Sequence, residues 1–310
     1  MMLFKPKFWN TQNNIFSLML LPLTLLVLIF IFFKRNLTKI KKFKIPIICI
    51  GNIFIGGTGK TPTSIFIAKE ISKLRRNPVI LKKFYKNQAD EHNLIKSNFK
   101  NLILNKSRIK GIVNAIELKH DSVIMDDGFQ DYKVKKDLNI ICFNSNQLIG
   151  NGLVLPSGPL REGINSLKYA QIILINGKKN ENFERKILKI NKNLKIFYSY
   201  FKAINIDKFK NKNLLAIAGI GNPENFFNLI EEHNLKIKKK LVFPDHHEFT
   251  INEINKILDN ANRENLQIIM TEKDYYKINK FKINRFEYLK VSLEVENKEK
   301  FISLIEEAYA

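Results

Sequence analysis

The chain carries a glycine-rich loop whose residue types could bind nucleotide phosphates. Residues 51–61 read Gly-Asn-Ile-Phe-Ile-Gly-Gly-Thr-Gly-Lys-Thr, after an apolar segment and directly before a helical pattern that opens at Pro62. In that setting backbone N–H groups surround a β-phosphate, a lysine supplies charge to the β- and γ-oxygens, and a hydroxyl reaches Mg²⁺. The general motif has Gly where this chain has Phe54. We predict a nucleoside triphosphate site whose ligands are Gly56, Gly57, Thr58, Gly59, Lys60 and Thr61.

Two adjacent carboxylates, Asp126 and Asp127, follow an apolar segment at 122–125. A carboxylate at the C-terminal end of a strand beside a phosphate loop is where nucleotide-binding proteins hold the metal, directly or through water. The alternative is a solvated Asp-Gly turn with Gly128. Because the phosphate loop occurs in the same chain, we favour a magnesium site that includes Thr61 and both aspartates.

These residues need a scaffold, and the pattern of short Ile- and Val-rich runs alternating with helical segments predicts an α/β fold with a mainly parallel sheet. We expect a domain boundary near residue 203, giving a phosphate-loop kinase core at 34–202 and a smaller α/β domain at 203–310 that closes the cleft. The expected strands are 45–50, 78–81, 122–125, 138–143, 171–175, 195–201, 214–218, 241–243 and 267–270. The expected helices are 62–75, 223–232 with Asn222 as its cap, and 251–261.

The N-terminal part, 1–33, is predicted to be a membrane segment. Residues 15–33 carry no charge, and 19 residues are just enough to cross a hydrocarbon core of about 30 Å. Six basic residues lie between Lys34 and Lys44, against two before the segment, which places everything downstream in the cytoplasm. We expect a spanning helix. Pro22 leaves open a shallowly embedded helix, and a buried soluble helix is the third alternative.

The composition is that of a folded globular chain. It is 45% hydrophobic and 26% charged, with 13 Gly, 9 Pro and 2 Cys among 310 residues, which excludes disorder, collagen and a disulfide scaffold. Cys49 and Cys142 each lie in an apolar run, so we expect reduced core residues and no zinc or redox motif. The net charge of +23 comes from lysines spread over the whole length. We therefore expect no nucleic-acid partner, whereas acidic lipid or phosphate stays open.

Further motifs follow in order along the chain: Gly150-Asn-Gly152, Leu155-Pro-Ser-Gly-Pro-Leu-Arg-Glu162, Phe243-Pro-Asp-His-His247 and Thr271-Glu-Lys-Asp274. Together with the phosphate loop, the double aspartate and the apolar N-terminus, they resemble the tetraacyldisaccharide 4′-kinases, the lipid A 4′-kinases of Gram-negative bacteria. The resemblance covers nearly the whole chain. It implies two α/β/α domains joined by a strand hinge, with the active site in the cleft between them.

The resemblance also implies an activity. The chain would use ATP and Mg²⁺ to phosphorylate the 4′-hydroxyl of an acylated glucosamine disaccharide 1-phosphate at the inner membrane, with its catalytic domains on the cytoplasmic side. Asp90 would match the family's catalytic acid, and His246 its histidine partner, with His247 as the alternative. Lys60 would be the third catalytic residue, and Glu91 a metal ligand. Substrate contacts would come from Asn151, Arg161 and Glu162.

Several structural interpretations compete with these roles. The segment around His246 precedes Thr250 and Glu253, a capping-box pattern, so it could simply lead into a helix, and 271–274 fits the same pattern. The chain departs from the family at 83–86, Ala89 and His92. The rival functions are a membrane-tethered switch NTPase acting through a protein partner, a kinase or ligase for a soluble metabolite, and a nucleic-acid-dependent ATPase.

Overall fold

The computed structural model describes residues 6–85, 88–245 and 247–309, and the chain folds into two compact units. Of the described residues, the larger unit contains those from Pro6 to Phe84, then Phe99–Tyr200, and those from Glu294 onward. The smaller unit contains Tyr85–Asn98 and Phe201–Leu293. These limits depart from the expected ones, because residues 85–98 belong to the smaller unit and the C-terminus returns to the larger one.

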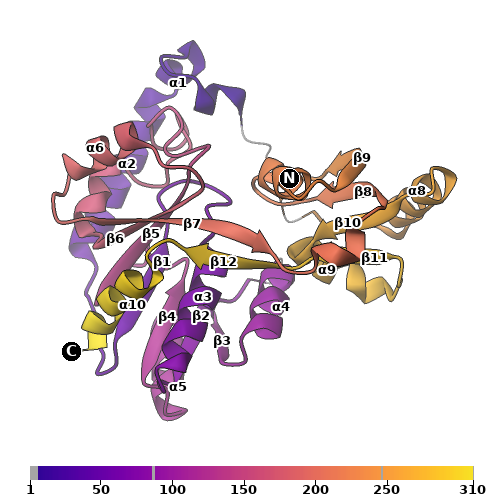
Figure 1. Cartoon of the computed structure of the whole chain (residues 1–310). Helices are drawn as coiled ribbons and strands as arrows, with labels where there is room; N and C mark the ends of the chain where they lie inside the picture. The colour runs from indigo at the N-terminus through magenta and orange to yellow at the C-terminus, as the bar shows by residue number, and fades with distance from the viewer. Residues whose placement is uncertain (1–5, 86–87, 246, 310) are drawn as a thin grey trace. The chain divides into compact units, whose positions relative to one another are not determined.

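The larger unit is built on an eight-stranded sheet of order β12-β7-β6-β5-β1-β4-β2-β3, in which every neighbouring pair from β7 to β3 is parallel. The predicted mainly parallel α/β architecture is confirmed (Figure 1). The strand β3 had no counterpart among the expected strands. The strands are β1 (Ile47–Gly51), β2 (Pro78–Lys83), β3 (Leu102–Asn105), β4 (Ser122–Asp126), β5 (Leu138–Asn144), β6 (Ile172–Asn176), β7 (Lys195–Ala203) and β12 (Val291–Val295).

Helices cover this sheet because each presents an apolar stripe to it. Alternate residues of β1, such as Ile47 and Cys49, face a core that also holds Ile112 and Phe183. Both cysteines are free and buried as predicted, and burial raises the pKa of Cys49 to about 11. The helices are α3 (Lys60–Lys73), α5 (Arg108–Glu117), α6 (Glu181–Leu188) and α10 (Lys298–Glu306).

The apolar N-terminal segment forms two helices, α1 (Ile15–Met19) and α2 (Leu21–Leu37), which are separated at Leu20. Pro22 lies in the first turn of α2, where its missing N–H costs no hydrogen bond, so the second helix begins there. In the part of the chain that the structure describes, no helix is both long and apolar enough to cross a membrane. The predicted spanning helix is therefore not confirmed.

The smaller unit has a four-stranded parallel sheet of order β11-β10-β8-β9. Thr250 and Glu253 form the predicted capping box at the start of α8, whereas the Asn222 side chain makes no cap hydrogen bond at α7. Its strands are β8 (Asn213–Ala218), β9 (Lys236–Val242), β10 (Gln267–Thr271) and β11 (Phe286–Leu289), and its helices are α4 (Ala89–Asn98), α7 (Pro223–Glu232), α8 (Ile251–Arg263) and α9 (Glu272–Ile278).

Candidate functional site

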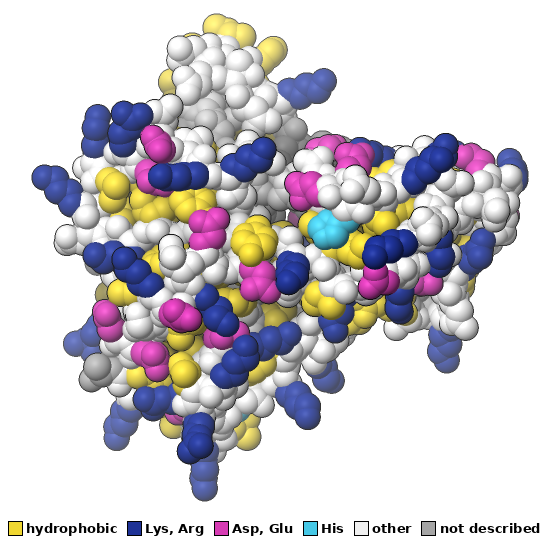
Figure 2. Space-filling model, viewed as in Figure 1, with side chains coloured by type: hydrophobic (Ala, Val, Ile, Leu, Met, Phe, Trp, Pro, Cys, Tyr) yellow, Lys and Arg dark blue, Asp and Glu magenta, His cyan; other side chains and the backbone are white. Residues whose placement is uncertain are grey.

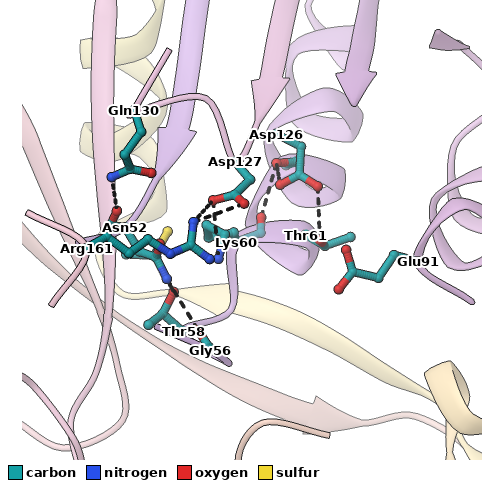
Figure 3. A network of polar contacts seen from close by, with 12 residues as sticks. Asn52, Gly56, Thr58, Lys60, Thr61, Glu91, Asp126, Asp127, Gln130 and Arg161 are labelled. Atoms are coloured by element: carbon teal, nitrogen blue, oxygen red, sulfur yellow. Dashed lines mark hydrogen bonds and ion pairs between the residues drawn. The ribbon is translucent and has the colours of Figure 1, made fainter. Parts of the chain in front are cut away.

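The phosphate loop connects β1 to α3, as its sequence predicts. Gly59 precedes the first residue of α3 with φ +86°, a left-handed backbone that suits glycine. Below the loop, the Asn52 amide nitrogen donates to Thr58 Oγ1 at 3.0 Å and to the Gly56 carbonyl at 3.3 Å (Figure 3). These bonds fix the loop in front of the α3 N-terminus, where the first backbone amides of the helix and its dipole favour an anion.

Asp126 ends β4 beside this loop and is fully buried. Its Oδ2 accepts hydrogen bonds from Thr61 Oγ1 at 3.0 Å and from Lys82 Nζ at 2.6 Å (Figure 3 shows the Thr61 contact). Ser64 Oγ donates to the other carboxylate oxygen at 3.2 Å. The structure thus brings the two predicted metal ligands Thr61 and Asp126 together, and adds a lysine that the sequence analysis had not selected.

Asp127 turns away from Asp126, because its backbone adopts the left-handed conformation with φ +53°. Arg161 Nη1 donates to both carboxylate oxygens, at 2.9 and 3.1 Å, and Lys60 Nζ lies 3.5 Å from Oδ1. Burial opposes the charge of Asp127, but Lys60, Arg161 and Lys82 outweigh it and hold the pKa of the carboxyl well below its usual range. Lys60 and Arg161 are therefore neighbours beside the phosphate loop, because both contact the Asp127 carboxylate.

The other two predicted substrate residues contact the N-terminal helices. The Asn151 amide nitrogen donates to Ser17 Oγ at 3.1 Å, and Glu162, only 2% exposed, pairs with Arg35 at 2.6 Å. Arg161 and Glu162 follow one another, so one side chain faces Asp127 and the next faces α2. The described contacts of Asn151 and Glu162 fasten α1 and α2 to the larger unit.

Asp90 and Glu91 lie in the first turn of α4, in the smaller unit. Lys273 Nζ lies 3.1 Å from Glu91 Oε1 and 3.7 Å from Asp90 Oδ2. It also lies 2.8 Å from Asp245 Oδ1. Burial opposes the charge of Lys273, but Glu91, Asp245 and Asp90 outweigh it and hold its pKa above the ordinary value.

The two histidines differ in what the structure says of them. His246, the predicted catalytic histidine, lies outside the described residues. His247 stacks on Phe243 with ring centroids 4.8 Å apart, meets Phe249 edge-on, and has its Nε2 3.2 Å from a Glu253 oxygen. These contacts give His247 a packing role beside the α8 capping box.

Three lysines that contact the candidate site residues were not predicted from the sequence: Lys82, Lys273 and Lys277. Lys82 directly follows an expected strand, so a rule that examines the residue after each parallel strand would have found it. Lys273 belongs to the 271–274 motif, which was interpreted as a helix cap. Among the residues that the structure describes, no three His, Cys, Asp or Glu side chains are grouped to hold a metal.

Comparison with known proteins identifies relatives along almost the entire chain. The sequence model of the family described as tetraacyldisaccharide-1-P 4′-kinase matches residues 16–310. The tetraacyldisaccharide 4′-kinase of Pelagibacter ubique strain HTCC1062 is 40% identical over 299 residues, which cover 95% of each chain. The enzyme of the same name from Francisella tularensis subsp. novicida strain U112 is 33% identical over 93% of this chain and 98% of its own.

One solved structure has the same fold. The crystal structure of LpxK from Aquifex aeolicus, described as an "apo" form in complex with ATP, superposes with a TM-score of 0.74. The superposition covers 96% of this chain and all of the other, at 24% sequence identity. This similarity supports the arrangement of strands and helices described above.

Proposed function

The chain belongs to the tetraacyldisaccharide-1-P 4′-kinase family, and we propose that it transfers the γ-phosphoryl group of ATP to the 4′-hydroxyl of an acylated disaccharide 1-phosphate in lipid A synthesis. The observation that carries this proposal is the arrangement at the phosphate loop. Lys60 and Arg161 flank Asp127, while the Thr61 hydroxyl meets Asp126. Phosphoryl transfer asks a protein mainly for alignment and charge neutralisation, which these groups supply.

The residues present fit MgATP. Mg²⁺ is usually held by one or two carboxylates together with substrate phosphates, so the Thr61 hydroxyl and the Asp126 carboxylate would suffice, with Asp127 close by. When bound, Mg²⁺ neutralises charge on the β- and γ-phosphates. The loop amides and Lys60 would bind and orient the oxygens of the β- and γ-phosphates. The planar guanidinium of Arg161 suits bidentate contact with a phosphate.

The sugar hydroxyl needs a proton acceptor. We place Asp90 and His246 in this role, with the histidine accepting the proton near neutral pH and the aspartate orienting it. The burial of Asp90, which is 5% exposed on α4, supports its assignment as an orienting carboxylate. Glu91, beside it, remains a proposed metal ligand.

The N-terminal helices are proposed to lie in the surface of the inner membrane, with the kinase on the cytoplasmic side. On α2, Thr24, Val27, Ile31 and Arg35 face the larger unit: Thr24 Oγ1 donates to Ser157 at 2.7 Å, and Val27 and Ile31 pack on the core. Apolar side chains also lie at the tip of the molecule where α1 is found (Figures 1 and 2). The outward side chains are strongly exposed and apolar: Ile15, Phe16, Met19, Leu23, Leu25, Leu26, Phe30, Phe32 and Phe33.

The inward face of α2 is therefore mixed, whereas its outward face is strongly apolar. A helix on the surface of a soluble protein normally turns polar side chains outward, so this exposed apolar face favours a lipid environment. An acylated substrate leaves the bilayer only at a cost of about 0.8 kcal/mol per exposed CH₂, so the enzyme has to reach it there. The lysines that follow α2 suit anionic lipid. On the face that Figure 2 shows, Lys and Arg side chains are scattered among acidic ones and do not form a continuous basic patch of the kind that a nucleic acid would favour.

The activity is tested by incubating the protein with γ-labelled ATP, Mg²⁺ and a disaccharide 1-phosphate lipid, followed by thin-layer chromatography. Label should enter the lipid, and Asp90→Ala and His246→Ala should each slow the transfer. Release of inorganic phosphate without labelled lipid would instead favour the switch NTPase. If Asp90→Ala and His246→Ala both kept the wild-type rate at saturating substrate, their assignment would be wrong.

Membrane association is tested by sedimentation with vesicles that contain anionic lipid. The double variant Leu26→Glu/Phe30→Glu should remain in the supernatant, whereas Leu118→Glu, an equally exposed apolar position on the same unit, should sediment like the wild type. Equal sedimentation of the double variant and the wild type would overturn the proposed orientation.

A further inference from the structure

One lysine joins two separate segments of the smaller unit. Lys273 on α9 reaches Asp245, in the loop after β9, at 2.8 Å, and it reaches both acidic residues of the first turn of α4, Glu91 at 3.1 Å and Asp90 at 3.7 Å. The residues it joins are far apart in sequence, and Glu91 and Lys273 are separated by 182 positions. One ammonium group therefore contacts both segments at the place where they meet.

The chemistry of lysine suits this position. An ammonium is a compact charge with three N–H donors, and three carboxylates surround it here. The Lys273 side chain is 13% exposed and that of Asp90 is 3% exposed, so water screens this pair weakly, whereas Asp245 at 32% is screened more. Without Lys273, Glu91 and Asp245 would lose the cation between them, and Asp90 would keep Lys277, 3.6 Å away. The three carboxylates would then repel one another, and we expect α4 to move relative to the loop of Asp245.

The helix that carries Lys273 is itself held firmly. Asp274 Oδ2 accepts from the Gly219 backbone N–H at 2.7 Å, and Asp274 Oδ1 pairs with Lys277 at 3.0 Å. Lys277 also lies 3.6 Å from Asp90 Oδ2. Packing of α4 on α9 adds a hydrogen bond from Asn98 to Glu272 at 3.0 Å. Lys273 therefore lies on a helix whose position is fixed by these contacts.

We propose that Lys273 is a positioning residue for phosphoryl transfer, which orients the Asp90 carboxylate and locks it to the loop of Asp245. The proposal rests on the proposed function, in which Asp90 helps to activate the sugar hydroxyl. Lys273 acts through Asp90 and has no direct role at the ATP phosphates. Its loss should therefore lower kcat and leave the binding of ATP unchanged.

The test compares the full-length wild type with Lys273→Met, Lys273→Arg and a control, Lys280→Met. Lys280 is an exposed lysine of the same unit that pairs with one carboxylate, Glu248 at 3.0 Å. Lys273→Met should lower kcat about 10²-fold, since a positioned proton acceptor contributes at least that much. Lys273→Arg should recover part of the loss, because it restores the charge but not the three-way geometry. Lys280→Met should be neutral.

Two further measurements separate positioning from misfolding. Calorimetry should give the same ATP stoichiometry and Kd for Lys273→Met as for the wild type, whereas a partly unfolded sample would bind less than one equivalent. In an Asp90→Ala background, Lys273→Met should cause no further loss. Asp245→Asn should restore part of the activity of Lys273→Met, because it removes one of the repelling charges.

The inference is overturned if Lys273→Met keeps wild-type kcat, if it lowers ATP stoichiometry in proportion to activity, or if its effect is as large in the Asp90→Ala background. These three results can be interpreted only if the wild-type enzyme transfers label to the lipid. A wild type that labels no lipid would instead refute the proposed function, so the two failures are distinguishable.

Discussion

Two clusters of charged residues, one in each unit, differ in the balance of their charges. The phosphate-loop cluster, in the larger unit, comprises Lys60, Lys82, Asp126, Asp127 and Arg161. The Lys273 cluster, in the smaller unit, comprises Asp90, Glu91, Asp245, Lys273, Asp274 and Lys277. The first holds three cations and two carboxylates; the second holds two cations and four carboxylates.

This difference matches the two halves of a kinase reaction. An excess of positive charge favours the binding of phosphates, and we expect Lys60 and Arg161, which already lie at the loop, to exchange Asp127 for a phosphate oxygen. An excess of negative charge favours proton uptake by a neighbouring group. We therefore assign the donor to the phosphate-loop cluster, and infer that the Lys273 cluster would favour protonation of the histidine proposed as the acceptor, which follows Asp245 in the sequence.

The largest effect should come from removing the charge that is assigned to the nucleotide phosphates. Lys60→Ala should lower kcat/KM on the order of 10³-fold, as loss of a charge-stabilising donor does in other enzymes, and it should weaken ATP binding. Lys110→Ala, an exposed lysine of α5, is the control. The measurement is label transfer at several ATP concentrations, and a loss in kcat/KM without weaker ATP binding would contradict the assigned role.

The parts of these clusters that lie within one sequence motif could be predicted, whereas contacts between residues far apart in the sequence could not. Thr61 and Asp126 were predicted to act together, because each follows a strand in a recognisable motif. Lys82 lies opposite Asp126 in the register of β2 and β4, but sequence alone does not say which strands are neighbours. The predicted strands stopped at Leu81 and Met125, one residue short of the contact.

The contacts of the Lys273 cluster were still harder to predict from the sequence, because they join three segments that are far apart in the chain. Thr271 does cap α9, accepting from the Asp274 amide, so the local interpretation of the motif is confirmed. What the motif also does, through Lys273, depends on partners in α4 and after β9 that come together only in the folded unit. The apolar segment 15–33 was predicted to span a membrane, which the structure does not confirm. Its division at Leu20 and its polar contacts at Ser17 and Thr24 depend on the rest of the larger unit.

The second prediction compares ion pairs by burial. Lys277 and Asp274 are 3% and 0% exposed, and Lys82 and Asp126 are 5% and 0% exposed, whereas Arg161 and Asp127 are 28% and 33% exposed. Lys277→Met and Lys82→Met each leave a buried carboxylate without its cation, so each should lower the free energy of unfolding by about 3 kcal/mol. Arg161→Met should lower it by less than about 1 kcal/mol, because water screens the exposed pair.

Urea unfolding of the three variants measures this ranking. The double variants Lys277→Met/Asp274→Asn and Lys82→Met/Asp126→Asn should recover part of the lost stability, because they remove the uncompensated charge as well. A loss for Arg161→Met that equals the loss for Lys82→Met would show that exposure does not separate the two kinds of pair.

The smallest effect should be on the pH dependence of the free energy of unfolding. The phosphate-loop cluster should lose stability as the pH falls, and the Lys273 cluster should lose stability as the pH rises. The pKa of Asp127 is held below its ordinary value of 3.8, so its contribution to stability is present above that pH and is lost as the pH falls through the lowered value. The pKa of Lys273 is held above its ordinary value of 10.5, so its contribution is present below that pH and is lost as the pH rises through the raised value.

Urea unfolding midpoints measured across pH test this prediction. Compared with the wild type, the midpoint of Asp127→Asn should change less with pH at the acid end, and that of Lys273→Met should change less at the alkaline end. Since Glu70, paired with Lys73 and Lys298, also has a lowered pKa, some acid dependence should remain in Asp127→Asn. Acid dependence that is unchanged in Asp127→Asn would mean that Lys60 and Arg161 do not stabilise its ionised form, and the comparison between the clusters would then rest on geometry alone.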